Sequence, residues 1–434
     1  MPGRQDQERL EGDLLTSPAG LSRPITLHHS ERDGFILPSF LDTLNPRFLS
    51  TPHTLFLTRT SPLFPFQKRP STHVTITSEE ALTMYEQMVM IRRLEAAAGN
   101  LYQDKSIRGF CHLYSGQEAV AVGMKAAMRS QDTLISSYRV HGWTYLMGVS
   151  PLGVLAELTG KSSGCARGKG GSMHMYCKNF YGGNGIVGAQ VPLGVGLAFE
   201  SLYNKTGGVC MALYGDGAAN QGQIFEVYNM AKLLNIPCIF VCENNGYGMG
   251  TSVERASAST AYYTRGDYVP GILVDGMDVL ASKTASKFAI DYATSGKGPI
   301  VMEMATYRYS GHSMSDPGTS YRSREEIQEV RQTRDAISHF KEKILAAGLV
   351  TAEQIKVESL HHTPALREII FLRASCVEEQ NTEKDNGRNG TRTQTPRLSG
   401  TCALTNFAIA TFCQTVVFVN LIFQIFRINN IIFN

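Results

Sequence analysis

The sequence has little excess charge of either sign, with 41 Lys and Arg against 38 Asp and Glu in 434 residues. The formal net charge of +3 gives no overall attraction to a polyanion, so we predict no nucleic-acid partner. Charged residues make up only 18% of the chain and hydrophobic residues 43%, which excludes a fully disordered or collagen-like protein. At about 150 residues per domain, the length is compatible with two or three folded units.

The nine cysteines contain no C-x-x-C pair and no His/Cys cluster with zinc-ligand spacing. Their odd number favours a reduced compartment over a disulfide framework. Cys238 and Cys242 lie in an apolar run, and we expect both to be small buried side chains. The sequence also shows no internal repeat of 20 to 50 residues and no secretory signal.

The first 70 residues have a different character from those that follow. Residues 1–42 mix acidic and basic side chains without sustained apolar periodicity, which predicts disorder. Residues 43–78 contain no acidic residue and interleave Arg and Lys with Ser, Thr, Leu and Phe, a composition typical of a transit peptide. Because this stretch follows an acidic head, a solvated linker is equally compatible. We interpret residues 1–70 as a disordered or targeting-like extension.

Residues 71–359 carry the patterns of an α/β domain. Thr77-Ser78-Glu79-Glu80 predicts the capped start of an amphipathic helix. Further on, apolar strands alternate with amphipathic helices, which predicts a parallel sheet flanked by helices. The expected strands are Val209–Tyr214, Pro237–Glu243 and Pro299–Ala305. The expected helices are Leu82–Leu101, Glu118–Met128, Gln223–Leu234, Asp278–Tyr292 and Arg324–Ala347, the last as one helix or a pair.

Residues 360–434 form a divergent tail in this interpretation. Residues 398–426 contain no charged side chain and are long enough for the roughly 20 residues of a membrane helix. Amides at positions 414, 420 and 424 argue against a membrane span. A membrane tail, a packed helix, an aggregation-prone segment and an end outside the functional fold therefore stay open as alternatives.

Two polar loops follow neighbouring predicted strands, Gly215-Asp216-Gly217 after the first and Asn244-Asn245 after the second. The carboxyl ends of parallel strands meet at one edge of a sheet, so we expect Asp216 and Asn245 to converge. Carboxylate and amide oxygens suit Mg²⁺, and glycines with a helix N-terminus suit a phosphate group. The sequence therefore predicts a magnesium and diphosphate site.

This arrangement resembles the signature of thiamine-diphosphate enzymes, in which GDG and NN are separated by 26 residues as they are here. Over about residues 71–350 the chain also resembles the alpha subunits of the pyruvate dehydrogenase component of its multienzyme complex. The motifs that carry this resemblance are Ile107–Leu113, Tyr138-Arg139, Gly168–Met175, Tyr181–Gln190, Gly248–Arg255 and Tyr307–Tyr321.

The resemblance implies a thiamine-diphosphate-binding fold in the mitochondrial matrix. It also implies a reaction in which pyruvate is decarboxylated on thiamine diphosphate and the acetyl group passes reductively to a lipoyl group. The implied partners are a beta subunit in an alpha2beta2 heterotetramer, the lipoyl domain of the acetyltransferase component, and a regulatory kinase and phosphatase. A beta-subunit glutamate contacts the cofactor in such enzymes, so we expect this chain to be inactive alone.

Carried over residue by residue, the resemblance implies that Asp216 and Asn245 bind Mg²⁺ through their side chains. Tyr247 would bind the same ion through its backbone carbonyl, and Gly217 and Ala218 would approach the diphosphate. This set gives the ion oxygen ligands only.

The remaining cofactor contacts implied by the resemblance come from earlier in the chain. Tyr138 and Arg139 correspond to the pair on the diphosphate, where a guanidinium gives a bidentate contact. Gly185 and Val187 correspond to residues that line the cofactor.

His112 and His312 correspond to active-site histidines, with His312 also near the cofactor. Ser313 and Ser320 correspond to phosphorylated serines in a regulatory loop, and Ser252 corresponds to a third. A phosphate group beside His312 and the diphosphate would repel and disorder the loop, so activity should fall.

Two positions depart from the usual pattern of the family. Ser310 stands where the first histidine of His-Gly-His-Ser is usual, and loss of that histidine would weaken the network that orders the loop. Gly246 stands where Arg is usual. The alternatives are an alpha subunit acting on branched-chain 2-oxo acids or acetoin, a catalytically silent truncated form that binds the beta chain, and a membrane-tethered protein. The run Gly215–Gly222 and the Met-His-Met motif favour pyruvate.

Overall fold

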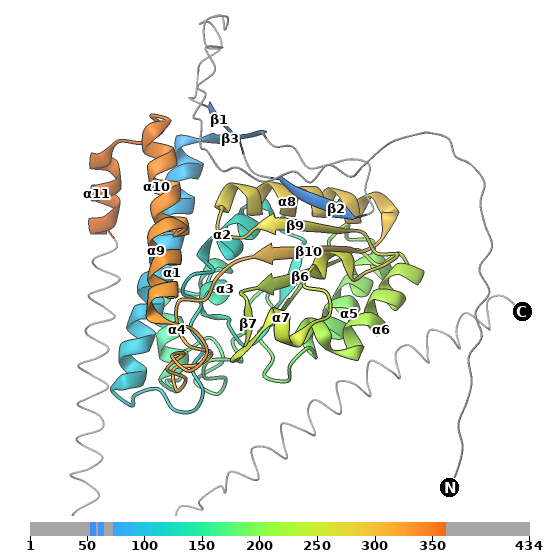
Figure 1. Ribbon diagram of the computed structural model, residues 1–434, viewed down its shortest axis with the longest axis horizontal. Coiled ribbons are helices and arrows are strands. Elements are labelled where there is room, and N and C mark those ends of the chain that lie inside the picture. The colour runs from blue at the N-terminus through green and yellow to red at the C-terminus, as the bar shows by residue number, and fades with distance from the viewer. Residues whose placement is uncertain (1–52, 58–59, 65–72, 362–434) are drawn as a thin grey trace, which may run out of the picture. The chain divides into compact units, whose positions relative to one another are not determined.

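The computed structural model describes residues 53–57, 60–64 and 73–361, and these residues build a sheet covered by helices on both faces (Figure 1). Most of the predicted 1–70 extension and nearly all of the predicted tail, including the apolar run 398–426, lie outside the described residues. Among the helices that are described, none is both long and apolar enough to cross a membrane.

The central sheet has the strand order β2-β9-β10-β6-β5-β4. The bounds are β2 Thr60–Phe64, β4 Thr133–Ile135, β5 Cys210–Gly215, β6 Cys238–Asn244, β9 Gly271–Asp275 and β10 Ile300–Ala305. The five strands from β9 to β4 are parallel, which confirms the predicted parallel sheet flanked by helices.

Strand β2 departs from that prediction, because it pairs antiparallel with β9 at the edge of the sheet. It lies in the stretch that the sequence assigned to an irregular extension. Pro62 within this strand weakens the strand pattern, yet proline is compatible with an edge position. A second pair, β1 (His53–Leu57) with β3 (His73–Thr77), is also antiparallel and begins before the expected domain boundary.

Helices cover both faces of the sheet in two groups. The first face carries α1 Ser78–Gln103, α2 Glu118–Ala127, α3 His141–Leu146, α4 Pro151–Leu158, α8 Val279–Tyr292 and α10 Ala336–Ala346. The second face carries α5 Gln190–Tyr203 and α6 Gly222–Leu233. The short α7 Val253–Ala256, α9 Arg324–Thr333 and α11 Ala352–His361 complete the described helices. The predicted Arg324–Ala347 segment is therefore a helix pair.

The side chains of each central strand point alternately to the two faces of the sheet, and apolar side chains are buried on both faces. In β5, Met211 and Leu213 belong to the first hydrophobic cluster and Tyr214 to the second. Successive side chains of a strand point to opposite faces, so a strand covered on both sides has a continuous apolar run. Cys238 and Cys242 are fully buried on the second face, as the sequence predicted.

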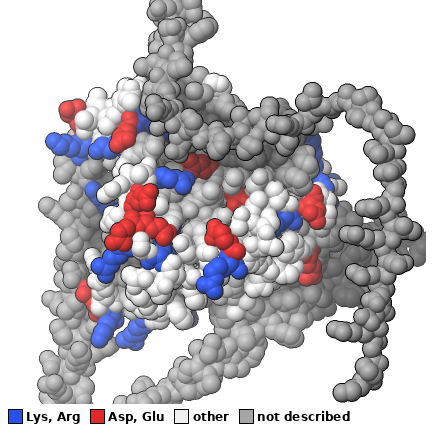
Figure 2. All heavy atoms as spheres, in the orientation of Figure 1, with Lys and Arg blue, Asp and Glu red and all other residues white. Residues whose placement is uncertain are grey.

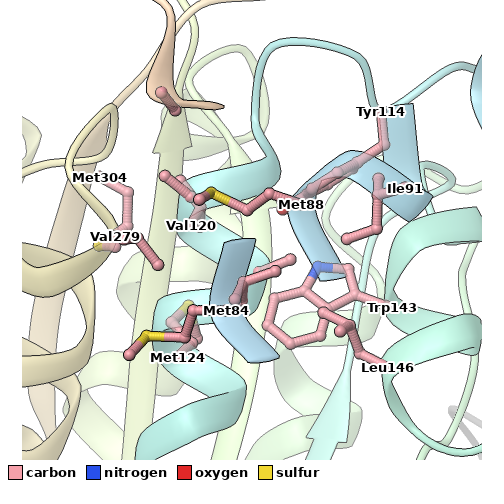
Figure 3. Packing of buried hydrophobic residues seen from close by; sticks show 14 of the residues in the cluster. Met84, Met88, Ile91, Tyr114, Val120, Met124, Trp143, Leu146, Val279 and Met304 are labelled. Atoms are coloured by element: carbon pink, nitrogen blue, oxygen red, sulfur yellow. The ribbon is translucent and has the colours of Figure 1, made fainter. Parts of the chain in front are cut away.

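The first face is filled by large apolar side chains around the single tryptophan. Figure 3 shows Trp143 and Leu146 of α3 near Met88 and Ile91 of α1. Trp143, Met88 and Ile91 have no exposed surface. Burial of apolar surface at about 25 cal/mol per Å² makes this layer a main source of stability.

The start of α1 confirms the predicted capping motif. The Thr77 side chain accepts a hydrogen bond from the Glu80 N–H, and the Glu80 carboxylate accepts one from the Thr77 N–H. These two bonds satisfy amide groups that a helix start otherwise leaves unpaired.

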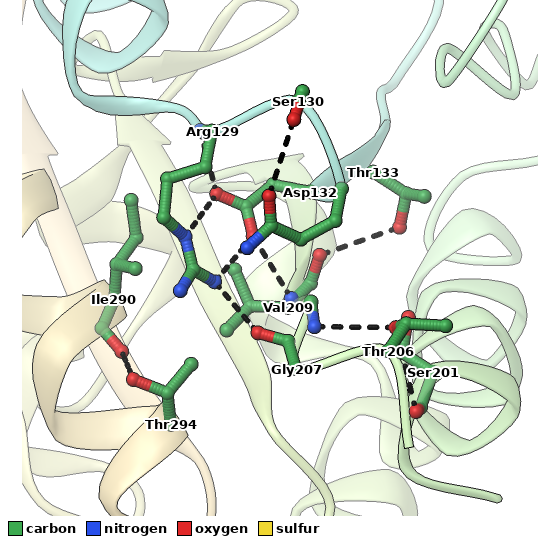
Figure 4. A network of polar contacts seen from close by, with 12 residues as sticks. Arg129, Ser130, Asp132, Thr133, Ser201, Thr206, Gly207, Val209, Ile290 and Thr294 are labelled. Atoms are coloured by element: carbon green, nitrogen blue, oxygen red, sulfur yellow. Dashed lines mark hydrogen bonds and ion pairs between the residues drawn. The ribbon is translucent and has the colours of Figure 1, made fainter. Parts of the chain in front are cut away.

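A polar network anchors the amino ends of two neighbouring strands (Figure 4). Asp132 precedes β4 and accepts hydrogen bonds from the Val209 N–H, at 3.1 Å, and from the Arg129 guanidinium. Arg129 also donates to the Gly207 carbonyl. The network ties the chain before β4 to the chain before β5 at the edge of the sheet opposite their carboxyl ends.

Charged side chains do not gather by sign on the face shown in Figure 2. Small groups of acidic side chains lie close to basic ones over this face, with uncharged surface between them.

The glycine-rich loop after α4 is organised by one buried carboxylate. Glu157 has no exposed surface and accepts hydrogen bonds from the N–H groups of Ala166, Gly168 and Gly170 at 2.7, 2.9 and 2.6 Å. Both oxygens of the carboxylate are used, and all three donors are backbone amides.

We expect Glu157→Gln to lower the free energy of unfolding by about 2–4 kcal/mol, because the new amide group points a donor at backbone donors in a buried site. Chemical denaturation of the two proteins measures the difference. Glu200→Gln on exposed α5 surface is the matched control and should change stability by less than about 0.5 kcal/mol. Equal stability of the Glu157 variant and the wild type would contradict the assignment.

Candidate functional site

A cavity of about 900 Å³ lies at the carboxyl ends of β5 and β6. Every residue that the sequence assigned to the cofactor lines this cavity, as do His112, Ser313 and Ser320, whereas Ser252 is not among the lining residues. The predicted cofactor residues that line it are Tyr138, Arg139, Gly185, Val187, Asp216, Gly217, Ala218, Asn245, Tyr247 and His312.

Asp216 and Asn245 converge because the strands that precede them are neighbours. Strands β5 and β6 are parallel, with Gly215 paired to Glu243, so the two loops leave the same edge of the sheet. Asp216 is 2% exposed and Asn245 is 7% exposed. Burial raises the pKa of Asp216 to about 6, and the charge of Arg308 opposes this rise. A cation in the cavity would stabilise the ionised carboxylate in the same way.

Two glycines let these loops approach each other closely. A Cβ atom on Gly217 would lie 3.2 Å from the Gly248 Cα, and one on Gly248 would lie 3.1 Å from the Gly217 Cα. Side chains larger than glycine would therefore separate the loops that carry Asp216 and Tyr247. Gly246 has a φ angle of +86°, a conformation that glycine adopts without strain.

His112, Tyr138 and His312 form an aromatic cluster on the cavity wall. The His112 ring centroid lies 4.4 Å from that of Tyr138 and 5.3 Å from that of His312. Burial, together with the Arg139 charge, lowers the pKa of His112 to about 3 and that of His312 to about 4. The lowered pKa values disfavour protonation, so both imidazoles are neutral near pH 7.

Arg139 is buried against the same wall. Its guanidinium donates to the carbonyls of Leu113, at 2.8 Å, and His312, at 2.6 Å. The His112 Nδ1 atom lies 3.0 Å from that second carbonyl. These contacts fix Arg139 and both histidines relative to each other. The His312 Nδ1 atom is buried and has no hydrogen-bond partner among the described residues.

The loop after β10 packs against the site through Asp316. Its carboxylate accepts hydrogen bonds from the His312 N–H, the Gly318 N–H and the Tyr321 hydroxyl, at 2.7, 2.8 and 2.6 Å. Ser313 is 7% exposed, whereas Ser320 is exposed to solvent. Of the predicted phosphorylation positions, Ser313 is thus the most closely packed against the cavity.

Ser310 contributes to this loop through its backbone. Its carbonyl accepts hydrogen bonds from Arg308 Nε, at 3.2 Å, and from Arg322. These contacts do not depend on the side chain at position 310, so the absence of the usual histidine leaves them in place.

Sequence reasoning missed several polar residues that line the cavity, among them Gln117, Glu243 and Arg308. Arg308 donates to the Asn245 Oδ1 atom at 3.3 Å and to the Tyr247 carbonyl at 3.2 Å. Burial raises the pKa of Glu243 to about 7, opposed by the Tyr114 hydroxyl. A charged residue at the end of an apolar strand could have signalled Glu243. Nothing in the local sequence distinguishes Gln117.

The donor set suits a hard cation and not a soft one. Within the described residues, no group of three or more His, Cys, Asp or Glu side chains is arranged to hold a metal ion. The cavity is instead lined by Asp216, Asn245 and Tyr247, which carry a carboxylate, an amide oxygen and a backbone carbonyl. Arg308 donates hydrogen bonds to the last two of these oxygens. Oxygen donors that leave room for phosphate oxygens and water fit Mg²⁺.

Comparison with known proteins adds to this geometry. Residues 86–366 match the dehydrogenase E1 component family. The chain is similar to the "probable pyruvate dehydrogenase E1 component subunit alpha, mitochondrial" of Caenorhabditis elegans, with 63% identity over 308 residues, 71% of this chain and 78% of the relative. It is 61% identical to the type I mitochondrial pyruvate dehydrogenase E1 alpha subunit of Ascaris suum over 321 residues, which are 74% of this chain and 81% of the relative. It is 59% identical to the human somatic mitochondrial pyruvate dehydrogenase E1 alpha subunit over 290 residues, which are 67% of this chain and 74% of the relative. The resemblance predicted from the motifs is confirmed.

Proposed function

The chain belongs to the dehydrogenase E1 component family, and on this premise we propose that it is the alpha subunit of a pyruvate dehydrogenase. The enzyme would decarboxylate pyruvate and transfer the acetyl group reductively to a lipoyl group. The observation that carries the proposal is the convergence of Asp216, Asn245 and the two histidines on one cavity in a chain with relatives of that name.

Members of this family depend on thiamine diphosphate, and we propose that the cavity holds this cofactor together with a magnesium ion. Glycine at positions 217 and 248 lets the two loops beside Asp216 approach each other closely, and the buried His312 Nδ1 atom has no hydrogen-bond partner among the described residues. We assign the Mg²⁺ ligands to Asp216, Asn245 and the Tyr247 carbonyl. When bound, thiamine diphosphate supplies the electron sink for decarboxylation of a 2-oxo acid.

The chain's own residues position and protect the reacting groups. Tyr138 and Arg139 lie where they can hold the diphosphate, and Gly185 and Val187 where they can line the cofactor. The lowered pKa values keep His112 and His312 neutral near pH 7, so each can donate one hydrogen bond and accept another at its imidazole nitrogens.

Pyruvate is favoured over branched-chain 2-oxo acids or acetoin because the relatives described above are all named for pyruvate. A catalytically silent form is not favoured, because the chain is 59–63% identical to relatives named as subunits of pyruvate dehydrogenase. Co-purification with a pyruvate dehydrogenase beta subunit, followed by a reduction assay, tests the substrate. We expect turnover with pyruvate to exceed turnover with a branched-chain 2-oxo acid by at least about a hundredfold, which is about 2.7 kcal/mol. A preference for the branched-chain acid would overturn the proposal.

Exposed apolar side chains at and beside the mouth of the cavity support a beta-subunit partner. Phe110 is 63% exposed, and Ile186 and Val187 are each 43% exposed. Clustered apolar surface of this kind is typical of an interface. We propose that the beta chain covers it in an alpha2beta2 heterotetramer, located in the mitochondrial matrix.

We expect the isolated chain to show no pyruvate decarboxylation above background, because it leaves the cavity open to water and lacks the partner's glutamate that the resemblance implies. Adding the beta chain should restore turnover. A coupled assay of each chain alone and of both together measures this. Full turnover by this chain alone would contradict the expectation.

Regulation is part of the same proposal. We propose that a kinase phosphorylates Ser313, Ser320 and Ser252, that a phosphatase reverses this, and that a lipoyl domain of the acetyltransferase component receives the acetyl group. The packing of Ser313 against the cavity supports a direct effect of its modification on activity.

A further inference from the structure

Three buried side chains form a hydrogen-bonded row in the wall of the cavity. Gln117 Nε2 donates to Glu243 Oε1 at 3.4 Å, and Asn245 Nδ2 donates to Gln117 Oε1 at 3.0 Å. The exposed fractions of Gln117, Glu243 and Asn245 are 1%, 3% and 7%. The row thus runs from a carboxylate through one amide to a second amide, with little access to water.

The contacts of Glu243 set the direction of the row. Its Oε1 atom accepts hydrogen bonds from the Tyr114 hydroxyl and from the Gln117 NH₂ group, so Gln117 turns its NH₂ group toward Glu243. The carbonyl oxygen of Gln117 then faces Asn245 and requires the Asn245 NH₂ group. The Asn245 carbonyl oxygen is left to point away from the row.

Two other contacts require the same orientation of Asn245. Its Oδ1 atom accepts hydrogen bonds from the Arg308 guanidinium, at 3.3 Å, and from the Tyr247 N–H, at 3.4 Å. Both groups can only donate, so an Asn245 amide turned the other way would place NH₂ against two donors and lose its bond to Gln117.

We propose that Glu243 and Gln117 are positioning residues that orient the Asn245 amide so that its oxygen, and not its nitrogen, faces the metal. The inference rests on the proposed function, since it assigns Asn245 as a Mg²⁺ ligand. Neither Glu243 nor Gln117 is assigned as a ligand of the ion. Residues that orient metal ligands typically change metal affinity by about 10- to 100-fold when they are replaced.

The test measures Mn²⁺ binding to the alpha-beta complex with thiamine diphosphate present, from the loss of the free-ion electron paramagnetic resonance signal. Gln117→Met keeps the length of the side chain and removes both amide contacts. We expect it to weaken Mn²⁺ binding about 10- to 100-fold. Gln354→Met, the same change on the exposed surface near the start of α11, should leave binding unchanged.

The double substitution Gln117→Glu with Glu243→Gln exchanges the carboxylate and the amide. The hydrogen bond between positions 117 and 243 is reversed, because the amide is now at position 243 and donates to the carboxylate at position 117. That carboxylate still accepts from the Asn245 NH₂ group, so the orientation of Asn245 is preserved. We expect Mn²⁺ affinity within about threefold of wild type. If Gln117→Met does not assemble with the beta chain, the Mn²⁺ affinity of this double variant alone tests the proposal.

Wild-type affinity in an assembled Gln117→Met variant, or a loss above tenfold in the exchanged variant, would overturn the proposal. Asp216→Ala separates this result from a failure of the proposed function. If Asp216→Ala leaves Mn²⁺ binding intact, the site itself is wrong. If it abolishes binding while Gln117→Met does not, only the orienting role is wrong.

Discussion

Asp216→Ala in the alpha-beta complex is expected to lower pyruvate turnover by about a thousandfold, equivalent to about 4 kcal/mol in the barrier. Asp216 is the only carboxylate among the three proposed ligands, so its removal takes away the only charged contact between the chain and the ion. The metal fixes the diphosphate of the cofactor and would be lost or displaced.

Purified complex is assayed for pyruvate-dependent reduction over a range of Mg²⁺ concentrations. The fold should survive, because removal of Asp216 also removes the cost of burying a carboxylate. Asp291→Ala on the exposed surface of α8 is the matched control and should keep activity within twofold. Turnover above a tenth of wild type for Asp216→Ala at saturating Mg²⁺ would end the assignment of this residue as a ligand.

Ser313→Glu is expected to lower turnover by at least about a hundredfold, or about 2.7 kcal/mol. The Ser313 hydroxyl is buried and lies 2.8 Å from the Ser315 hydroxyl. A carboxylate there would be desolvated and would lie close to Asp316, which holds the loop through three hydrogen bonds. The loop would leave its packed position and carry His312 with it.

Two further variants separate charge from other effects of this change. Ser313→Ala removes the hydroxyl without adding charge and should keep turnover within threefold. Ser320→Glu places the same charge on an exposed residue of the loop and should lower turnover less than tenfold. Limited proteolysis with trypsin should cleave the loop faster in Ser313→Glu than in wild type. A Ser313→Glu complex with more than half of wild-type turnover would contradict the proposed loop mechanism.

The strands that build the site could be predicted from sequence because each is a long apolar run that ends in polar residues. The expected strands Val209–Tyr214 and Pro237–Glu243 differ from β5 and β6 by only one residue at each end. The short β4 spans three residues, and β9 begins directly after Pro270 at a glycine, so neither has a recognisable pattern.

Some residues of the site could likewise be predicted from the sequence and others could not. Asp216 and Asn245 could be predicted to converge because parallel strands place their carboxyl ends together. The position of Gln117 could not be predicted. Its two hydrogen-bond partners lie more than a hundred residues away in the sequence, and its neutral amide is not a residue type that indicates a catalytic or metal site. Arg308 lies in a recognised motif, but its contacts to Asn245 and Tyr247 depend on how the loop folds back over the cavity.

The position of strand β2 bears on where a protease could cut if it removed an N-terminal targeting segment. It belongs to the stretch whose composition is typical of a transit peptide, yet it pairs with β9 at the margin of the sheet. An import-linked protease that cut after Phe64 would remove both β1 and β2 and leave the β9 backbone as a bare edge, where another chain could add a strand. A cut that preserves the pairing of β2 with β9 would have to fall before Thr60.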